Sequence, residues 1–241
     1  MLDWEAMLAK DRLIVALDVP SATQARQVVQ TLGDTVSIYK VGKQLFTAEG
    51  PQFVRELVSS GRKVFLDLKF HDIPNTVAEA IRSAARLGVS MVNVHASGGS
   101  KMMHAAVEAA AQSESKPLVL AVTVLTSLSD SDLQDIGFSG NALSQVMRLA
   151  ALARNAGCGG VVASASEARE LRREMGLDFV IVTPGVRAAG APLDDQSRVL
   201  TAAEAIAAGA DYVVVGRPIL KADQPLAAAS EITAEIASAA R

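Results

Sequence analysis

The sequence contains little cysteine, few aromatic residues and no long apolar run. Among 241 residues there is one cysteine and one tryptophan, and aromatic side chains make up 4%. A single cysteine excludes an internal disulfide framework and a zinc site built from several cysteines. No apolar run approaches the ~18 residues that cross a bilayer, and charges are scattered through the first dozen residues, so neither a membrane span nor a signal peptide is expected.

A strong excess of one charge is also missing. The chain has 23 Lys and Arg against 26 Asp and Glu, which gives a net charge of −3, and it has no basic block. Proteins that bind nucleic acids usually carry a basic patch, so we expect no nucleic-acid partner. These features predict a cytoplasmic protein without a membrane partner. The length suits one domain that covers residues 1–241.

The chain does show a regular alternation of two kinds of segment. Short runs of β-branched and aliphatic residues alternate with alanine-rich stretches of helical spacing. The predicted strands cover 13–19, 37–42, 63–69, 91–96, 118–124, 160–164, 179–183 and 212–216. Apolar strands joined by helices are typical of a parallel sheet buried on both faces, and eight such units predict an α/β fold, the closed (β/α)8 TIM barrel. An open, doubly wound sheet is less suitable, because the first strand ends in LDVPSAT without a glycine-rich turn.

Polar side chains stand at the carboxyl ends of the predicted strands, where the active sites of barrels lie. Asp18 ends the first strand, Lys40 lies in the second, and Asp67 and Lys69 end the third. On a strand, Asp67 and Lys69 share one face, which we assign to the barrel interior. Opposite charges are costly there unless they pair, so each is expected to stabilise the other.

Other polar residues have more than one interpretation. Asp72 could complete this charged set, or it could only cap the helix that begins at Pro74. His71 and His95 are expected to be structural or to support the site from behind. Cys158 has no base near it in the sequence and is expected to be a packing residue.

The end of the eighth strand has the features of a phosphate site. Gly216 and Arg217 fall where this strand gives way to a helix, and backbone N–H groups with a guanidinium can bind an anion there. The irregular segment 184–200 carries Arg187 and Gln196 and could fold over the anion. Arg217 could instead form a surface salt bridge. No P-loop, HExxH motif or convincing metal spacing is present, so neither a metal nor a cofactor is expected.

The segment DLKFHDIPNT at 67–76 resembles the DxKxxDIPxT signature of the orotidine 5′-phosphate decarboxylase family. Further segments resemble the family in the expected order: ALD at 16–18, YKVG at 39–42, NVHASGG at 93–99, AVTVLTS at 121–127, VTPGVR at 182–187 and VVVGRPI at 213–219. The resemblance implies cofactor-independent loss of CO2 from orotidine 5′-phosphate to give uridine 5′-phosphate in pyrimidine biosynthesis.

The resemblance also implies a role for each matching residue. Lys69 would be the catalytic lysine, set between Asp67 and Asp72, and Lys40 would complete the charged network. Asp67 would also face the substrate carboxylate. The remaining substrate contacts would be Asp18 and Lys40 at the ribose, Thr126 at the pyrimidine, and Arg187, Gln196, Gly216 and Arg217 at the phosphate. The family is a homodimer, in which Asp72 and Thr76 would reach the neighbouring subunit's site.

Two other functions stay open. A related sugar-phosphate barrel, such as 3-keto-L-gulonate 6-phosphate decarboxylase or a hexulose-phosphate synthase, shares the DxK core but uses magnesium to stabilise an enediolate. The DIPNT continuation and Lys40 favour the pyrimidine enzyme. A phosphate-binding barrel that has lost catalysis would be expected to have a broken charge set, whereas this sequence keeps all the members: Asp18, Lys40, Asp67, Lys69 and Asp72.

Overall fold

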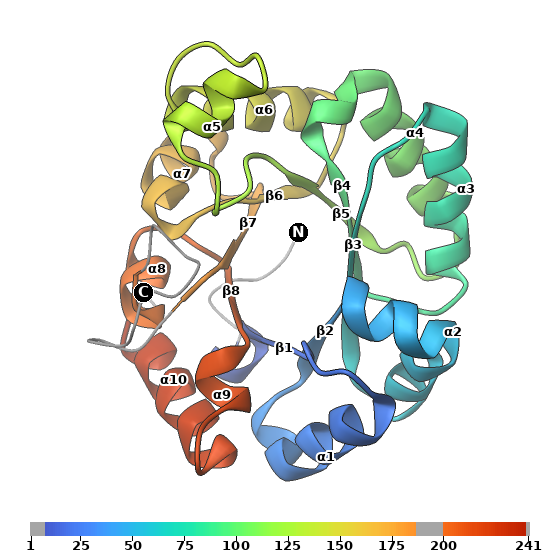
Figure 1. Ribbon diagram of the computed structural model, residues 1–241, viewed down its shortest axis with the longest axis vertical. Helices are drawn as coiled ribbons and strands as arrows, with labels where there is room; N and C mark the ends of the chain where they lie inside the picture. Colours follow the sequence, from blue (N-terminus) through green and yellow to red (C-terminus); the bar gives the residue numbers. More distant parts are fainter. Residues whose placement is uncertain (1–7, 187–199, 240–241) are drawn as a thin grey trace.

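Eight parallel strands close into a barrel, in sequence order, in the computed structural model of the protein, which describes residues 8–186 and 200–239 (Figure 1). The strands are β1 (Leu13–Ala16), β2 (Ile38–Gly42), β3 (Lys63–Phe70), β4 (Met91–His95), β5 (Leu118–Val122), β6 (Gly160–Val162), β7 (Val180–Pro184) and β8 (Tyr212–Val215). The barrel closes because β1 pairs with both β2 and β8. The predicted (β/α)8 fold is confirmed, and each strand overlaps its predicted range.

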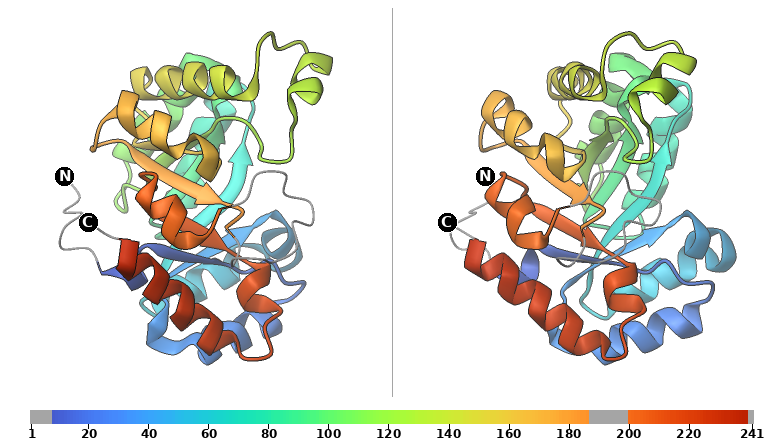
Figure 2. Two further views of the ribbon diagram at one scale, coloured as in Figure 1. Left: turned by 90° about the vertical axis from the view of Figure 1, so that its left-hand side faces the viewer. Right: turned by 60° about the vertical axis from the view of Figure 1, so that its left-hand side comes forward.

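Helices surround the sheet on its outer side, and α5 projects at one end of the barrel (Figure 2). They are α1 (Ala22–Leu32), α2 (Lys43–Ser59), α3 (Pro74–Ala85), α4 (Gly99–Ala111), α5 (Asp130–Asp135), α6 (Ala142–Asn155), α7 (Ala168–Met175), α8 (Ala202–Ala207), α9 (Arg217–Leu220) and α10 (Pro225–Ala239), with short 3-10 turns at η1 (Ala9–Asp11), η2 (Gly33–Thr35), η3 (Ala96–Gly98) and η4 (Ala165–Glu167). Within the described residues, no helix has the length and apolar character needed to cross a membrane.

Side chains of each strand alternate between the barrel interior and the layer under the helices. Interior positions hold a buried apolar cluster that includes Ile14, Ile38, Phe65, Leu120 and Val182. A larger cluster fills the space between sheet and helices. Both faces of the strands are therefore buried, which explains their nearly continuous apolar sequences, and the barrel interior is a packed core rather than a channel.

A buried ionic network holds together the amino-terminal ends of several strands, at the end of the barrel opposite the predicted active site. Arg172 of α7 donates to the carboxylate of Asp211 at 2.5 Å and also to the carbonyl oxygen of Gly209. Arg12 donates to the carbonyl oxygens of Ala210 and Asp211. The Asp211 carboxylate in turn accepts the backbone N–H of Ile181, so this network joins β7 to the residues that directly precede β1 and β8.

Candidate active site

A cavity of about 260 Å³ opens among the residues at the carboxyl ends of the strands. Its apolar wall comes from the interior core and includes Phe65, Val122 and Val162. The rest of the lining includes most of the residues predicted from the sequence: Asp18, Lys40, Asp67, Lys69, Thr126, Gly216 and Arg217. Residues far apart in the chain therefore meet at one site, as the barrel topology predicts.

Four charged side chains form a row of alternating sign across this cavity. Lys40 Nζ lies 2.9 Å from Asp18 Oδ1 and 3.3 Å from Asp67 Oδ2. Lys69 Nζ lies 2.6 Å from Asp67 Oδ1. The side chains of Lys40 and Asp67 are 10% and 11% exposed, whereas Asp18, at the end of the row, is 54% exposed. The predicted pairing of Asp67 with Lys69 is confirmed, and Lys40 extends it.

The pKa values of the two buried members follow from this row. Burial alone would raise the pKa of Asp67, but the ammonium groups of Lys40 and Lys69 outweigh it and hold the pKa of this carboxyl below its usual value. Burial alone would lower the pKa of Lys40, but Asp67 and Asp18 outweigh it and raise that pKa. Both groups are therefore ionised at neutral pH, and the carboxylate and the ammonium each stabilise the charged form of the other.

The backbone of β3 is irregular where it carries the pair. On a regular strand, Asp67 and Lys69 would lie on one face with their Cα atoms ~6.6 Å apart. The pairing of β3 with β4 shifts register between Leu66 and Phe70, and Lys69 adopts a φ of +53° in the left-handed region. Its N–H donates to Asn93 Oδ1 at 2.8 Å. Lys69 was predicted from the sequence as a site residue, but its left-handed backbone and the register shift beside it were not.

Two glycines border the charged row, and only Gly42 lies in tight contact with it. A Cβ at Gly42 would lie 2.9 Å from Lys40 Nζ and 3.2 Å from Asp18 Oδ1. A Cβ at Gly216 would lie 3.6 Å from Asp18 Oδ2. Gly216 is among the predicted site residues, whereas Gly42 is not, although it ends the YKVG segment. A side chain at position 42 would therefore push against the ammonium of Lys40, which would have to shift.

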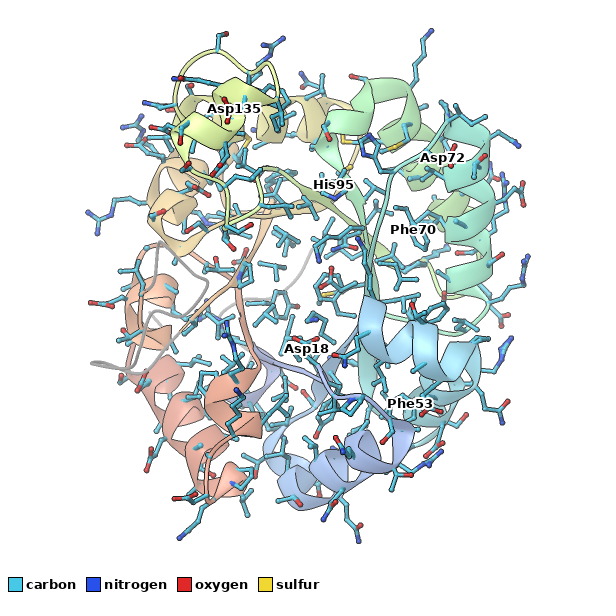
Figure 3. All side chains as sticks on the ribbon, in the orientation of Figure 1. Asp18, Phe53, Phe70, Asp72, His95 and Asp135 are labelled. Carbon is cyan, nitrogen blue, oxygen red and sulfur yellow. The ribbon has the colours of Figure 1, made fainter. Side chains whose placement is uncertain are left out.

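Two predicted residues lie away from the cavity. Asp72 and Thr76 are exposed at the start of α3, and Figure 3 shows Asp72 at the rim of the barrel while Asp18 lies near its centre. Asp72 Oδ1 accepts the N–H of Ile73 at 2.6 Å, before the helix begins, and α3 has no side-chain cap. Asp72 therefore does not cap this helix. Two further predicted residues, Arg187 and Gln196, lie outside the described residues.

Neither His71 nor His95 lines the cavity that holds the charged row. The rings of His71 and His95 are 5.5 Å apart and tilted, and they line a second cavity of about 190 Å³ next to apolar residues of the α5 segment. Burial, followed by the charges of His71, Lys43 and Lys69, lowers the pKa of His95. Cys158 is buried, and burial raises the pKa of its thiol to about 12, so it acts as a packing residue.

The described residues bring together no group of three or more His, Cys, Asp or Glu side chains that could hold a metal ion. The cavity instead presents two ammonium groups, two carboxylates and the guanidinium of Arg217. Such a site can hold an anion at one end and keep a cation fixed against an apolar wall at the other. These are the requirements for stabilising negative charge that develops on a bound phosphate ester.

Comparison with known proteins gives one consistent result. The model of the Orotidine 5'-phosphate decarboxylase / HUMPS family matches residues 11–232. Orotidine 5'-phosphate decarboxylase from Alkalilimnicola ehrlichii is 54% identical over 231 residues, which cover 96% of this chain and 98% of the relative. The enzyme of that name from Hydrogenovibrio crunogenus is 51% identical over 225 residues, covering 93% and 95%.

A solved structure agrees with these sequence matches. The crystal structure of orotidine 5'-phosphate decarboxylase from Lactobacillus acidophilus has a TM-score of 0.83 to this chain at 38% identity. The similarity covers 94% of this chain and 99% of that one. Sequence, fold and site thus lead to one assignment: the chain belongs to the Orotidine 5'-phosphate decarboxylase / HUMPS family.

Proposed function

We propose that this protein is an orotidine-5′-phosphate decarboxylase, which converts orotidine 5′-phosphate into uridine 5′-phosphate and CO2 in pyrimidine biosynthesis. The observation that carries the proposal is the row Asp18–Lys40–Asp67–Lys69, which lies beside an apolar wall in the cavity. Relatives that share half of the chain's residues have this activity in their names. The cytoplasmic location and the independence from metals and cofactors remain predictions.

The reaction leaves negative charge on a carbon atom. The bond between C6 and the carboxylate breaks, its electron pair stays on C6, and CO2 departs. The resulting vinyl carbanion has no cofactor to take up its electrons, so a fixed cation must stabilise it and a proton must then reach C6. An ammonium group meets both needs, because it supplies the charge before proton transfer and becomes a neutral amine after it.

Lys69 is the ammonium group that we assign to C6. Asp67 holds its Nζ at 2.6 Å, and the side chain is 25% exposed, so the cation is fixed and partly desolvated. Asp67 also separates Lys69 from Lys40, which keeps two like charges close without leaving either unpaired. Asp67 would face the carboxylate that leaves as CO2. After the proton transfer, solvent returns a proton to Lys69.

The other cavity residues suit the rest of the substrate. Asp18 forms the exposed end of the row and Lys40 is its buried neighbour, and both would bind the ribose hydroxyls. Thr126 would contact the pyrimidine. The phosphate would lie against Gly216 and Arg217, with Arg187 and Gln196 as further contacts. Binding energy from the phosphate, which is remote from C6, can then be used to hold the reacting carbon beside Lys69.

We also propose that the active enzyme is a homodimer. Residues 71–76 are exposed without interruption, and within this segment Ile73, an apolar residue, is 67% exposed. Asp72 and Thr76 lie on this exposed segment rather than in the cavity. They can serve an active site only if a neighbouring subunit brings that site to them. In such a dimer, Asp72 would complete the charged set around the neighbour's Lys69.

The direct test is the ultraviolet absorbance of orotidine 5′-phosphate mixed with purified, EDTA-treated protein. The expected result is a steady spectral change to uridine 5′-phosphate that does not require added metal. A flat trace with orotidine 5′-phosphate, together with magnesium-dependent turnover of a sugar phosphate, would contradict the proposal. That outcome would instead support the sugar-phosphate alternative.

A further inference from the structure

Asn93 on β4 contacts both members of the Asp67–Lys69 pair. Its Nδ2 donates to Asp67 Oδ1 at 2.7 Å, and its Oδ1 accepts the backbone N–H of Lys69 at 2.8 Å. The residue is completely buried, with 0% exposure. The amide of Asn93 therefore donates one hydrogen bond to the Asp67 carboxylate and accepts another from the Lys69 backbone. Both bonds lie in an environment where an unpaired polar group is costly.

The register shift explains why β3 needs this amide. The pairs Leu66↔Val92 and Phe70↔Val94 are joined by four steps along β3 but only two along β4. The surplus residues of β3 include Lys69, whose left-handed backbone is unfavourable for any residue with a Cβ. Asn93 lies between the two β4 partners, and its side chain supplies the acceptor that a regular ladder would have taken from the backbone.

The same amide also orients the carboxylate. Asp67 Oδ1 accepts from both Asn93 Nδ2 and Lys69 Nζ, while Oδ2 faces Lys40 Nζ. Because Asn93 is completely buried and its amide is hydrogen-bonded at both ends, it fixes the plane of the carboxylate and thereby the positions of the two ammonium groups. An aspartate at position 93 could accept from Lys69 but could not donate to Asp67, and an apolar side chain could do neither.

We infer that Asn93 is a positioning residue, which keeps the backbone of Lys69 left-handed and the Asp67 carboxylate oriented, so that the Lys69 ammonium is aimed into the cavity. The inference rests on the proposed function, since it gives this ammonium group the central role in the reaction. Asn93 does not line the cavity, so it acts through the pair and not through contact with a substrate.

The test is the turnover of orotidine 5′-phosphate by Asn93→Ala, compared with its affinity for uridine 5′-phosphate. Loss of two hydrogen bonds to the pair is expected to lower kcat by about 10- to 100-fold. Affinity for the product is expected to change less than about threefold, because its ribose and phosphate contacts are intact. Asn93→Asp is expected to lower kcat at least as much, since it places a second carboxylate against Asp67.

The matched control is Thr183→Val on β7. Thr183 is equally buried, and its hydroxyl has no hydrogen-bond partner among the described residues. This variant is expected to keep the wild-type kcat. Should Asn93→Ala fail to fold, Asn93→Ser provides the same two measurements in a variant that keeps a polar side chain.

Two results would overturn the inference. One is a kcat for the Asn93 variants equal to that of Thr183→Val. The other is a parallel loss of kcat and product affinity, which would indicate general damage to the site. Wild-type protein is assayed alongside: if it fails to turn over orotidine 5′-phosphate, the proposed function fails, whereas a normal wild-type rate with unaffected variants contradicts the role of Asn93 alone.

Discussion

Replacing Asp67 by asparagine removes one charge from the centre of the buried row and keeps the size of the side chain. Lys40 and Lys69 would then face each other across a neutral amide. Lys40 would retain Asp18 as a partner, but that carboxylate is 54% exposed and compensates only in part. Removing one partner of a buried ion pair destabilises a protein by ~3–5 kcal/mol. We expect about 3 kcal/mol here, at the lower end, because the cavity admits water.

For a domain of this size, such a loss lowers the melting temperature by roughly 2–4 °C per kcal/mol, or about 6–12 °C in total. Urea denaturation followed by circular dichroism at pH 7 gives the free energy of unfolding directly. The matched control is Asp18→Asn, at the exposed end of the same row. Because exposed pairs contribute little, this variant is expected to lose less than about 1 kcal/mol.

The pH dependence gives an independent check on the cause. The two lysines hold the pKa of Asp67 below its usual value of ~3.9, so its stabilising effect is complete above that value. The effect is lost as the pH falls through the lowered pKa, when the carboxyl of the folded protein takes up a proton. The difference between wild type and Asp67→Asn should therefore shrink on acidification below about pH 4. A variant as stable as wild type at pH 7, or a difference that does not change with pH, would refute this reasoning.

Three further predictions concern the phosphate site, the dimer and the opposite end of the barrel. Arg217→Ala should raise KM by ~10- to 100-fold with a smaller effect on kcat, and added guanidinium should restore part of the loss in steady-state assays; an unchanged KM would exclude Arg217 from the phosphate site. Mixing inactive Lys69→Ala with inactive Asp72→Ala should restore about a quarter of the wild-type rate, since half of the dimers are hybrids with one intact site; no recovery after verified subunit exchange would contradict the shared site. Asp211→Ala should lower the free energy of unfolding by ~3–5 kcal/mol in urea titrations, because Arg172 is left buried without its carboxylate, while kcat at 25 °C stays the same; an unchanged stability would contradict the role given to this network.

The residues that the sequence predicts well are those whose roles depend on local pattern. The strands are buried on both faces and therefore read as apolar runs, so the barrel follows from counting them. Lys40 and Asp67 interrupt such runs, and a charge in a buried strand must have a partner. Their approximate meeting place is fixed once the strands form a closed barrel with their carboxyl ends together.

Other features depend on contacts that no local pattern encodes. The left-handed backbone of Lys69 results from a register shift between β3 and β4, and β-bulge geometry depends on how the two strands pair. Asn93 could have been suspected as a polar residue at an interior strand position, but its two partners emerge only from the pairing. The tight space at Gly42 results from the close approach of Lys40 and Asp18, which are 22 residues apart in the chain.

The most direct test of the central claim, that the Lys69 ammonium stabilises and protonates C6, is the kcat of Lys69→Ala with orotidine 5′-phosphate. Removing a fixed cation and a general acid together is expected to lower kcat by at least about 10⁴-fold. Circular dichroism of the variant establishes that it is folded. A folded Lys69→Ala protein that decarboxylates orotidine 5′-phosphate within about tenfold of the wild-type rate would contradict the account, because the row of charges would then serve another purpose.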